Sequence, residues 1–345
     1  MTRRIALLGT GAIGSSIGAD LTVAGHDVVL IDQWPAHVEA MKTGGLHISM
    51  PDQELHTPVS AMHLCDMRAA KEPFDIVFLT AKSYDTRWMV HFIEPYLKRD
   101  GVLVSVQNSL NDEWIAPIIG YERDIGSVIE LSAKMFEPGR VKRNTSRAKT
   151  WFALGELHGR VTPRVQELAE ILRASGTVEV STNIWGAKWT KLVVNSMFMS
   201  LCGILGILDW EITQNPKLLN LGIELGKEAM KVGTTMGYRL EPIFGMSAED
   251  FLGSNDEVLK NSLTTLLSHI GKEALNCIYQ DHLKGRRTET EFLNGLIVKK
   301  GQEVNIQTPL NEAIASMTKQ IEQGVLKPSL SNLEILKNWV GPILN

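Results

Sequence analysis

Apolar runs and helical stretches alternate along the first half of the chain. Continuous apolar runs of this length are typical of strands buried on both faces of a parallel sheet. The predicted strands are Arg4–Leu8, Asp27–Asp32, Phe74–Thr80, Val102–Gln107, Asp124–Glu130, Thr150–Leu154 and Thr177–Val180. The predicted helices are Ala12–Ala24, Pro35–Thr43, Arg87–Leu97 and Pro163–Ala174. This β-α-β alternation predicts a doubly wound parallel sheet.

The pattern changes after about residue 183. Strand-like runs stop there, and helical periodicity continues to the end of the chain. The sequence therefore predicts an α/β domain over residues 1–182 and an all-helical domain over residues 183–345. A segment near Glu249–Ile270 is expected to form an extra or extended helix without an assigned role. The cleft between the domains is the expected active site.

Composition narrows the classes of function. The chain has 35 Lys and Arg against 39 Asp and Glu, so it lacks the basic excess that nucleic-acid binding requires. Cys65, Cys202 and Cys277 lie far apart, which predicts neither disulfides nor a metal site and favours a cytoplasmic location. The apolar stretch Leu192–Leu208 contains polar residues and is shorter than the ~20 residues of a spanning helix, so no membrane contact is expected.

A glycine-rich motif separates the first predicted strand from the first helix. It reads Gly9, Thr10, Gly11, Ala12, Ile13, Gly14. Gly9 permits a tight turn, Gly11 lets the backbone approach a pyrophosphate, and Gly14 lets helix and strand pack closely. The N–H groups at the helix start then face the phosphates. The alternative is a glycine-rich turn that binds no ligand, but both flanking elements favour dinucleotide binding.

Asp32 ends the second predicted strand, 18 residues after Gly14. A carboxylate there can accept hydrogen bonds from both hydroxyls of an adenine ribose and repels a 2′-phosphate. The adjacent residues 31–34 contain no arginine. The cofactor is therefore NAD or NADP, with NAD favoured. The alternative is that Asp32 only caps the helix that starts near Pro35.

Lys191 and Asn195 are spaced i, i+4 within an apolar helical stretch, so both project from one face. Reduction of a carbonyl by hydride requires a proton donor of this kind. A lysine among Leu192, Val193 and Val194 either extends to the surface or lies in a cleft with a function. The aligned amide favours the functional interpretation.

The chain resembles the ketopantoate reductase family over nearly its whole length. The pieces that carry the resemblance are the glycine-rich loop, Thr80-Ala-Lys82, Gln107-Asn108, Lys191-x-x-x-Asn195, the stretch from Arg287 through Glu289 to Asn294-Gly295, and Thr308-Pro309-Leu-Asn311. The family implies a Rossmann domain joined to a helical domain of the 6-phosphogluconate dehydrogenase type. Separately, the apolar character of the predicted helical domain makes a homodimer a reasonable expectation.

The resemblance implies roles for individual residues. Lys191 would give the proton to the keto oxygen and Asn195 would hydrogen-bond the substrate. Asn108 would lie where the nicotinamide ribose and the substrate meet, with Lys82 beside the nicotinamide end. Glu289 would contact the cofactor or orient Lys191, although a solvated charge that balances Arg286 or Arg287 is the alternative.

Two further positions belong to this implied set. Asp209 lies where the family places another substrate-contacting residue, usually asparagine, and Met135 lies at a backbone position near the cofactor.

The sequence also departs from the family. Met199 stands where a second substrate asparagine is common, and Cys277 stands where a substrate serine is expected. Ser109 replaces the glycine after Asn108. Because a site that hydrogen-bonds a hydroxyl discriminates strongly, losing two polar anchors indicates a substrate other than ketopantoate. Methionine and cysteine would accommodate a larger or more apolar group at these substrate-binding positions.

The predicted activity is the NAD(P)H-dependent interconversion of a 2-oxo acid and a 2-hydroxy acid. A β-hydroxy acid or opine-type dehydrogenase is a second enzymatic possibility. A dinucleotide-binding sensor without turnover is the alternative from another class, and the intact glycine and lysine positions disfavour it.

Overall fold

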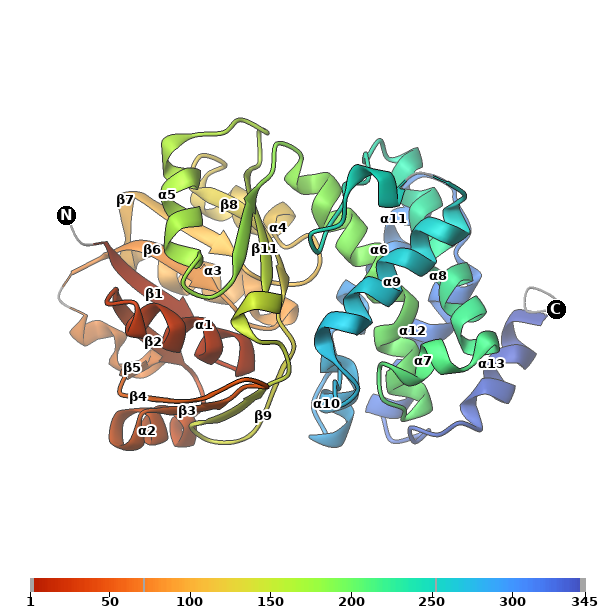
Figure 1. The fold of residues 1–345 in the computed structure, drawn as a ribbon, viewed down its shortest axis with the longest axis horizontal. Coiled ribbons are helices and arrows are strands. Elements are labelled where there is room, and N and C mark those ends of the chain that lie inside the picture. Colours follow the sequence, from red (N-terminus) through yellow and green to blue (C-terminus); the bar gives the residue numbers. More distant parts are fainter. Residues whose placement is uncertain (1–2, 71, 252, 342–345) are drawn as a thin grey trace. The chain divides into compact units, whose positions relative to one another are not determined.

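The computed structural model describes residues 3–70, 72–251 and 253–341. The chain forms two compact units, Met1–Trp185 and Gly186–Asn345. The division falls close to the boundary expected between residues 182 and 183. Figure 1 shows the elements of both units.

An eight-stranded sheet forms the centre of the first unit. Its strands, in spatial order, are β12 (Thr177–Val180), β11 (Trp151–Glu156), β8 (Asp124–Glu130), β7 (Leu97–Ser105), β6 (Phe74–Leu79), β1 (Arg4–Leu8), β2 (Asp27–Asp32) and β5 (Ser60–His63). All seven predicted strands are therefore confirmed. The expectation of a fully parallel sheet is wrong at β11, which pairs antiparallel with β8. No crossover helix lies between β8 and β11 in the chain, so the strand returns in the opposite direction.

A second sheet of four strands was not predicted. Its order is β4 (Glu54–Thr57), β3 (Leu46–Ser49), β10 (Arg140–Arg143) and β9 (Ala133–Glu137). These strands are four or five residues long and expose polar side chains such as Glu54 and Lys142. Short strands with one solvated face have no continuous apolar run, so the pattern that identified the main sheet could not identify them.

Helices cover both faces of the main sheet. They are α1 (Ala12–Val23), α2 (Pro35–Gly44), α3 (Thr86–Ile93), α4 (Asp112–Ile119) and α5 (Pro163–Leu172). Alternate residues of β1 enter two separate cores: Ile5 and Leu7 lie in one, and Ala6 and Leu8 in the other. Burial on both faces is why the strand is apolar throughout. Thr162 is the N-cap of α5, because its side chain accepts from the Val165 N–H.

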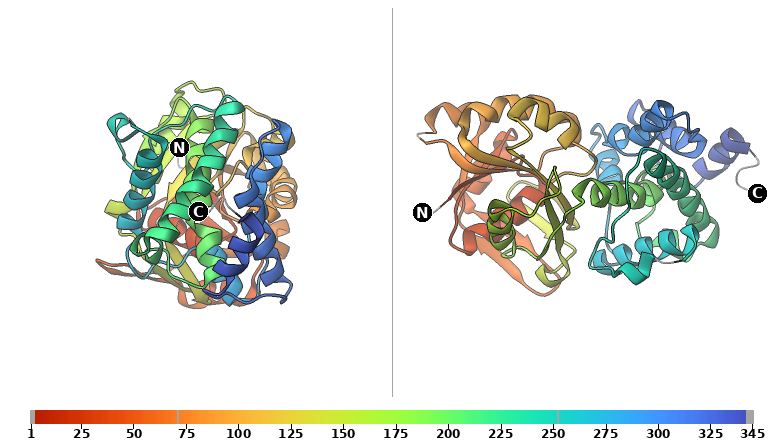
Figure 2. Two further views of the ribbon diagram at one scale, coloured as in Figure 1. Left: turned by 90° about the vertical axis from the view of Figure 1, so that its right-hand side faces the viewer. Right: turned by 90° about the horizontal axis from the view of Figure 1, so that it is seen from above.

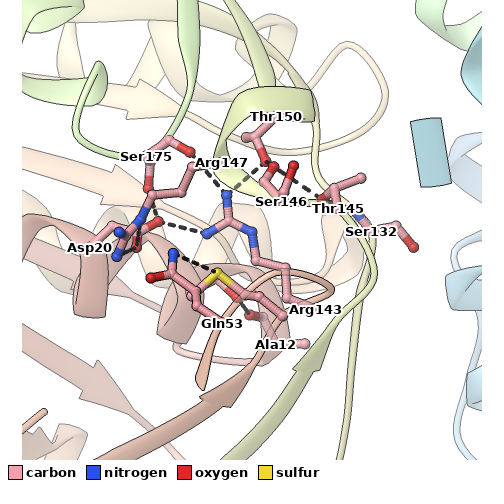
Figure 3. A network of polar contacts seen from close by, with 12 residues as sticks. Ala12, Asp20, Gln53, Ser132, Arg143, Thr145, Ser146, Arg147, Thr150 and Ser175 are labelled. Carbon is pink, nitrogen blue, oxygen red and sulfur yellow. Dashed lines mark hydrogen bonds and ion pairs between the residues drawn. The ribbon is translucent and has the colours of Figure 1, made fainter. Parts of the chain in front are cut away.

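A buried polar network ties α1 to the segment between the two sheets (Figure 3). The Asp20 carboxylate of α1 accepts hydrogen bonds from Arg143 of β10 at 2.6 Å, from Arg147 at 2.7 Å and from Ser175 at 2.6 Å. The side chains of Asp20 and Arg143 are both fully buried. A second Arg143 nitrogen donates to Thr150 Oγ1 at 2.7 Å. Each buried charge is therefore compensated, as a stable interior requires.

The described part of the second unit contains helices and no strand, as both views of Figure 2 show. The α-helices are α6 (Ile184–Leu205), α7 (Glu211–Gln214), α8 (Pro216–Thr235), α9 (Asn255–Ile270), α10 (Cys277–Leu283), α11 (Asn294–Glu303), α12 (Pro309–Glu322) and α13 (Asn332–Val340). The helix expected near Glu249–Ile270 is α9, which starts with a capping box between Ser254 and Glu257. Within the described ranges, no helix has the length and apolarity needed to cross a membrane.

Candidate active site

The glycine-rich loop has the geometry of a phosphate cradle. Gly9 adopts a φ of 87°, and a Cβ there would approach the Ala81 backbone to 2.8 Å. A Cβ on Gly14 would collide with Thr80 Oγ1, whereas a Cβ on Gly11 would meet nothing within 4 Å. Gly11 is also the N-cap of α1, and no side chain caps that helix. The open space and the uncapped N–H groups fit the pyrophosphate of a dinucleotide.

The Asp32 carboxylate lies beside this loop. One oxygen accepts from Thr10 Oγ1 at 3.2 Å, and the other accepts from the Trp34 N–H at 2.8 Å. Asp32 therefore holds the turn before α2 and contacts the glycine-rich loop. The alternative that it caps α2 is wrong, because the N-cap is Trp34 and no side chain caps that helix. Each carboxylate oxygen can accept more than one hydrogen bond, so the capacity to bind ribose hydroxyls remains.

His37 supports the same loop, and sequence reasoning missed it. Its Nε2 lies 2.8 Å from the Thr10 carbonyl, and its Nδ1 accepts from the Gly139 N–H at 3.0 Å. This pairing requires the neutral ring with the proton on Nε2. Burial lowers the pKa of His37 and opposes its ionisation. The ring thus connects the glycine-rich loop to the second sheet, a contact between distant segments that no local motif reveals.

The loops after β6 and β7 are held together by side chains. Asn111 Nδ2 donates to the Asn108 carbonyl at 2.6 Å and to Ser83 Oγ at 3.2 Å. Gln107 Nε2 donates to the Ala81 carbonyl at 2.8 Å. Lys82 and Asn108, the residues implied at the nicotinamide end, therefore belong to one cross-linked edge. The carboxyl ends of adjacent parallel strands form the usual dinucleotide site of such sheets.

Ser109 and Met135, the remaining candidate positions of this unit, differ in which of their atoms could contact a ligand. Ser109 adopts a φ of 78°, the left-handed conformation that explains why glycine would be expected there, and its buried hydroxyl has no hydrogen-bond partner. Met135 lies on β9, and its side chain is buried in the larger core of the unit, so only its backbone is available for the contact that the family implies.

In the second unit, Lys191, Asn195 and Met199 occupy successive turns of one face of α6. All three are buried, and Lys191 is only 9% exposed. The idea that Lys191 extends to the surface is therefore wrong. Its Nζ lies 4.5 Å from the centroid of the Phe244 ring.

Asp209 and Cys277 are linked through Asn276. Asn276 Nδ2 donates to Asp209 Oδ1 at 2.5 Å, and Asn276 Oδ1 caps α10 by accepting from the N–H groups of Ile278 and Tyr279. Cys277 is the first residue of α10. Burial raises the pKa of Asp209 to about 7. The structure therefore places Asp209 where it orients the helix start that carries Cys277.

Glu289 is 5% exposed, so the alternative of a solvated surface charge is wrong for it. Arg287 pairs with Glu291 instead. The turn that carries Glu289 is held by Glu322, which accepts from the Thr288 N–H at 2.7 Å and from the Thr288 hydroxyl at 2.5 Å.

The two asparagines that carry the resemblance bind each other. Asn294 Nδ2 donates to Asn311 Oδ1 at 2.9 Å and to the Ser196 carbonyl of α6 at 3.2 Å. Asn311 Nδ2 donates to Glu228 of α8 at 2.8 Å. These residues join α6, α8, α11 and α12 and thereby hold the helix that carries Lys191. Among the described residues, no three His, Cys, Asp or Glu side chains are grouped to hold a metal ion.

A dinucleotide-binding α/β unit followed by a helical unit with a buried lysine defines a class of NAD(P)-dependent oxidoreductases that act on CH–OH groups. Residues 5–157 match the family model of ketopantoate reductase PanE/ApbA, and residues 183–322 match the model of its C-terminal part. The chain belongs to the ketopantoate reductase family.

Individual relatives agree with this assignment. The chain is 30% identical to the 2-dehydropantoate 2-reductase of Pyrococcus horikoshii over 322 residues, which cover 92% of this chain and 97% of that one. A PanE/ApbA family ketopantoate reductase from Ralstonia eutropha JMP134 shares the fold with a TM-score of 0.77 at 25% identity, covering 93% of this chain and 99% of that one. D-mandelate dehydrogenase in complex with NADH and anilino(oxo)acetate has a TM-score of 0.82 at 24% identity, with the same coverage.

Proposed function

We propose that the protein reduces a 2-oxo acid to a 2-hydroxy acid with NADH or NADPH. The observation that carries this proposal is the buried Lys191, aligned with Asn195 on α6 in a chain that also has an intact dinucleotide loop. Lysine is rarely buried, and buried titratable groups concentrate at functional sites, so its presence in an apolar helix supports a chemical role.

The glycine-rich loop would hold the nicotinamide dinucleotide, which when bound would supply the hydride for the carbonyl carbon. Protonated Lys191 donates a proton to the carbonyl oxygen as negative charge develops there, and Asn195 hydrogen-bonds the substrate. General acid catalysis of this kind contributes about 10²–10⁴-fold in rate. Lys82 and Asn108 position the nicotinamide end, while Glu289 orients Lys191 or contacts the cofactor. The loop of residues 9–14 holds the pyrophosphate.

The substrate is a 2-oxo acid with a larger or more apolar side group than ketopantoate. Met199 is buried on the same face of α6 as Lys191, and Cys277 begins α10, so two positions that hold polar anchors elsewhere in the family carry soft, apolar side chains. Asp209 acts on the substrate through Asn276 and the start of α10. The fold shared with D-mandelate dehydrogenase, whose complex holds anilino(oxo)acetate, is consistent with an aromatic group.

NADH is the favoured cofactor. Asp32 directs a carboxylate at the expected ribose position, and a 2′-phosphate there would meet its negative charge. No arginine follows Asp32 in residues 33–35 to offset that repulsion.

The proposal is tested with a panel of 2-oxo acids that includes ketopantoate, phenylglyoxylate and branched aliphatic 2-oxo acids. Each is mixed with NADH or NADPH, and loss of the dihydronicotinamide absorbance is followed. We expect turnover of at least one bulky 2-oxo acid with a kcat/KM well above that for ketopantoate. Efficient use of ketopantoate, with a kcat/KM of about 10⁵ M⁻¹s⁻¹ or above, would contradict the proposed substrate.

The double variant Met199→Asn with Cys277→Ser tests the same substrate assignment from the other direction. It restores both polar anchors, so kcat/KM for ketopantoate should rise relative to that for the native substrate. Two unsatisfied groups at about 1–3 kcal/mol each correspond to roughly 10²–10⁴-fold if their effects are independent. An unchanged ratio of the two substrates would show that these positions do not set specificity.

We also propose a homodimer formed through the second unit. Val325, Leu330 and Trp339 are large apolar residues that are 67%, 62% and 45% exposed near α12 and α13. Light scattering during size-exclusion chromatography measures the mass directly. A monomer at micromolar concentration would contradict this assembly.

A further inference from the structure

Three consecutive residues of α6 contact one loop, the segment of residues 236–246 that follows α8. The Trp189 ring stacks on Tyr238 with centroids 4.8 Å apart and an angle of 12° between the planes. Thr190 Oγ1 accepts from the Glu241 N–H at 3.0 Å. Lys191 Nζ lies over the Phe244 ring. The loop therefore follows the turn of α6 that carries the proposed proton donor.

Phe244 has an unusual backbone. Its φ is 62°, in the left-handed region that bulky side chains rarely adopt, and Gly245 next to it also has a positive φ of 70°. The Phe244 ring is only 3% exposed, and Ile243 before it is fully buried. Strained conformations of this kind persist only where the surroundings enforce them, and they concentrate at functional sites. The backbone of Phe244 is therefore strained, and the contacts around it keep its ring at this position.

The ring face carries partial negative charge and attracts a cation within about 6 Å of its centroid. The Lys191 distance of 4.5 Å lies well inside that range. This contact stabilises a charged ammonium group, whereas it hardly stabilises a neutral amine. A general acid must be both protonated and correctly placed before the carbonyl is reduced.

We propose that Phe244 is a positioning residue that holds the Lys191 ammonium, in its charged form, at the site of proton donation. This inference rests on the function of Lys191 proposed above. Phe244 does not take part in the chemistry itself. Its effect on the reaction passes entirely through Lys191.

The test compares variants with and without an aromatic face. Phe244→Leu and Phe244→Met keep an apolar side chain but remove the ring, and kcat for the identified 2-oxo acid should fall by about 3- to 30-fold, the range of a desolvated cation–π contact. Phe244→Tyr and Phe244→Trp keep the face and should retain most of the kcat. The Kd for NADH, measured by quenching of protein fluorescence, should stay within about twofold in all four variants.

A double-mutant cycle separates positioning from general packing. In the Lys191→Ala background the contact is already absent, so adding Phe244→Leu should change kcat by less than about twofold. Tyr238→Leu is the matched control on the same loop, because it removes the stack on Trp189 and leaves the Phe244 ring in place. It should lower the melting temperature while kcat stays within about twofold of the unmodified protein.

Several outcomes would overturn the inference. One is a normal kcat in both Phe244→Leu and Phe244→Met. Another is a fall in kcat caused by Phe244→Leu that persists in the Lys191→Ala background. A third is a fall in kcat in Tyr238→Leu equal to that in Phe244→Leu. If Phe244→Leu does not fold, Phe244→Met and the two aromatic variants decide the question. A normal kcat in Lys191→Ala alone would instead refute the acid role of Lys191, which belongs to the proposed function.

Discussion

The two units hold their candidate functional residues in different ways. In the first unit, the cofactor loop consists of backbone at the carboxyl ends of strands, and its shape depends on glycines such as Gly9, whose φ is 87°. In the second unit, the site consists of side chains on α6, and residues from distant segments hold them, such as Phe244 beside Lys191. A site made of backbone is encoded locally, whereas a site made of side chains depends on tertiary contacts. The predictions below test how far this contrast extends.

The largest effect should come from breaking the buried network that anchors α1 of the first unit. Asp20→Ala leaves Arg143 buried without its carboxylate, and we expect the free energy of unfolding to fall by about 3–5 kcal/mol. The measurement is urea denaturation followed by circular dichroism. Glu167→Ala is the matched control, because Glu167 pairs with Arg3 at the surface and should cost about 0–1 kcal/mol. Equal effects of the two substitutions on the free energy of unfolding would show that burial of the Asp20–Arg143 pair does not increase its contribution to stability.

A somewhat smaller effect is expected at the buried carboxyl of the second unit. Burial raises the pKa of Asp209 to about 7, so the folded protein binds the proton more tightly than the unfolded chain does. This contribution to stability is complete below about pH 4, the ordinary pKa of the group, and is lost as the pH rises through about 7.

Asp209→Asn measures this contribution, because it removes the titration and keeps an oxygen that can accept from Asn276. The difference in unfolding free energy between the unmodified protein and the variant should change by about 2–4 kcal/mol between pH 4 and pH 8, with the unmodified protein relatively less stable at high pH. Parallel pH profiles for the two proteins would show that Asp209 titrates normally.

The difference in binding free energy between NADH and NADPH should be of intermediate size. We expect NADH to bind more tightly than NADPH by about 1–3 kcal/mol, the range of hydrogen bonds to a charged group. Asp32→Ser should narrow this gap while the Thr10 and Trp34 contacts weaken. Fluorescence titration with both cofactors gives the two Kd values. Equal or tighter binding of NADPH by the unmodified protein would mean that Asp32 serves only the turn into α2.

The smallest effect concerns the strained residue of the first unit. Ser109→Gly fits the φ of 78° without strain and removes a buried hydroxyl that has no partner, so the protein should gain about 1 kcal/mol in stability. Ser127 is the control: its hydroxyl is also buried without a partner, but it lies in β8 with an ordinary backbone. Ser127→Gly should therefore destabilise the protein. A loss of stability in both variants would show that Ser109 is not strained.

Sequence patterns predicted the inner strands of the main sheet because these strands are buried on both faces, and they missed the exposed edge strand β5. The run Ile5–Leu8 is apolar at every position since it feeds two cores. The same logic failed for β3 and β10, whose alternating polar residues give no such run. The prediction of a parallel strand was wrong at β11, because strand direction depends on the connection rather than on the strand's own sequence.

The sequence predicted some of the candidate functional residues in each unit and missed others. Spacing alone identified the glycine-rich loop, Asp32, and the shared face of Lys191 and Asn195. It could not identify His37 or Phe244, because each acts through a contact with a segment far away in the chain. A histidine in an ordinary helix and a phenylalanine in a loop carry no local signal of function.

Lys191 is proposed to donate the proton in the reduction of a 2-oxo acid. The most direct test is the kcat of Lys191→Ala for the identified 2-oxo acid, measured together with the Kd for NADH. We predict a loss of about 10²-fold or more in kcat with cofactor affinity almost unchanged. A variant that binds NADH normally and retains near-normal kcat would contradict the claim.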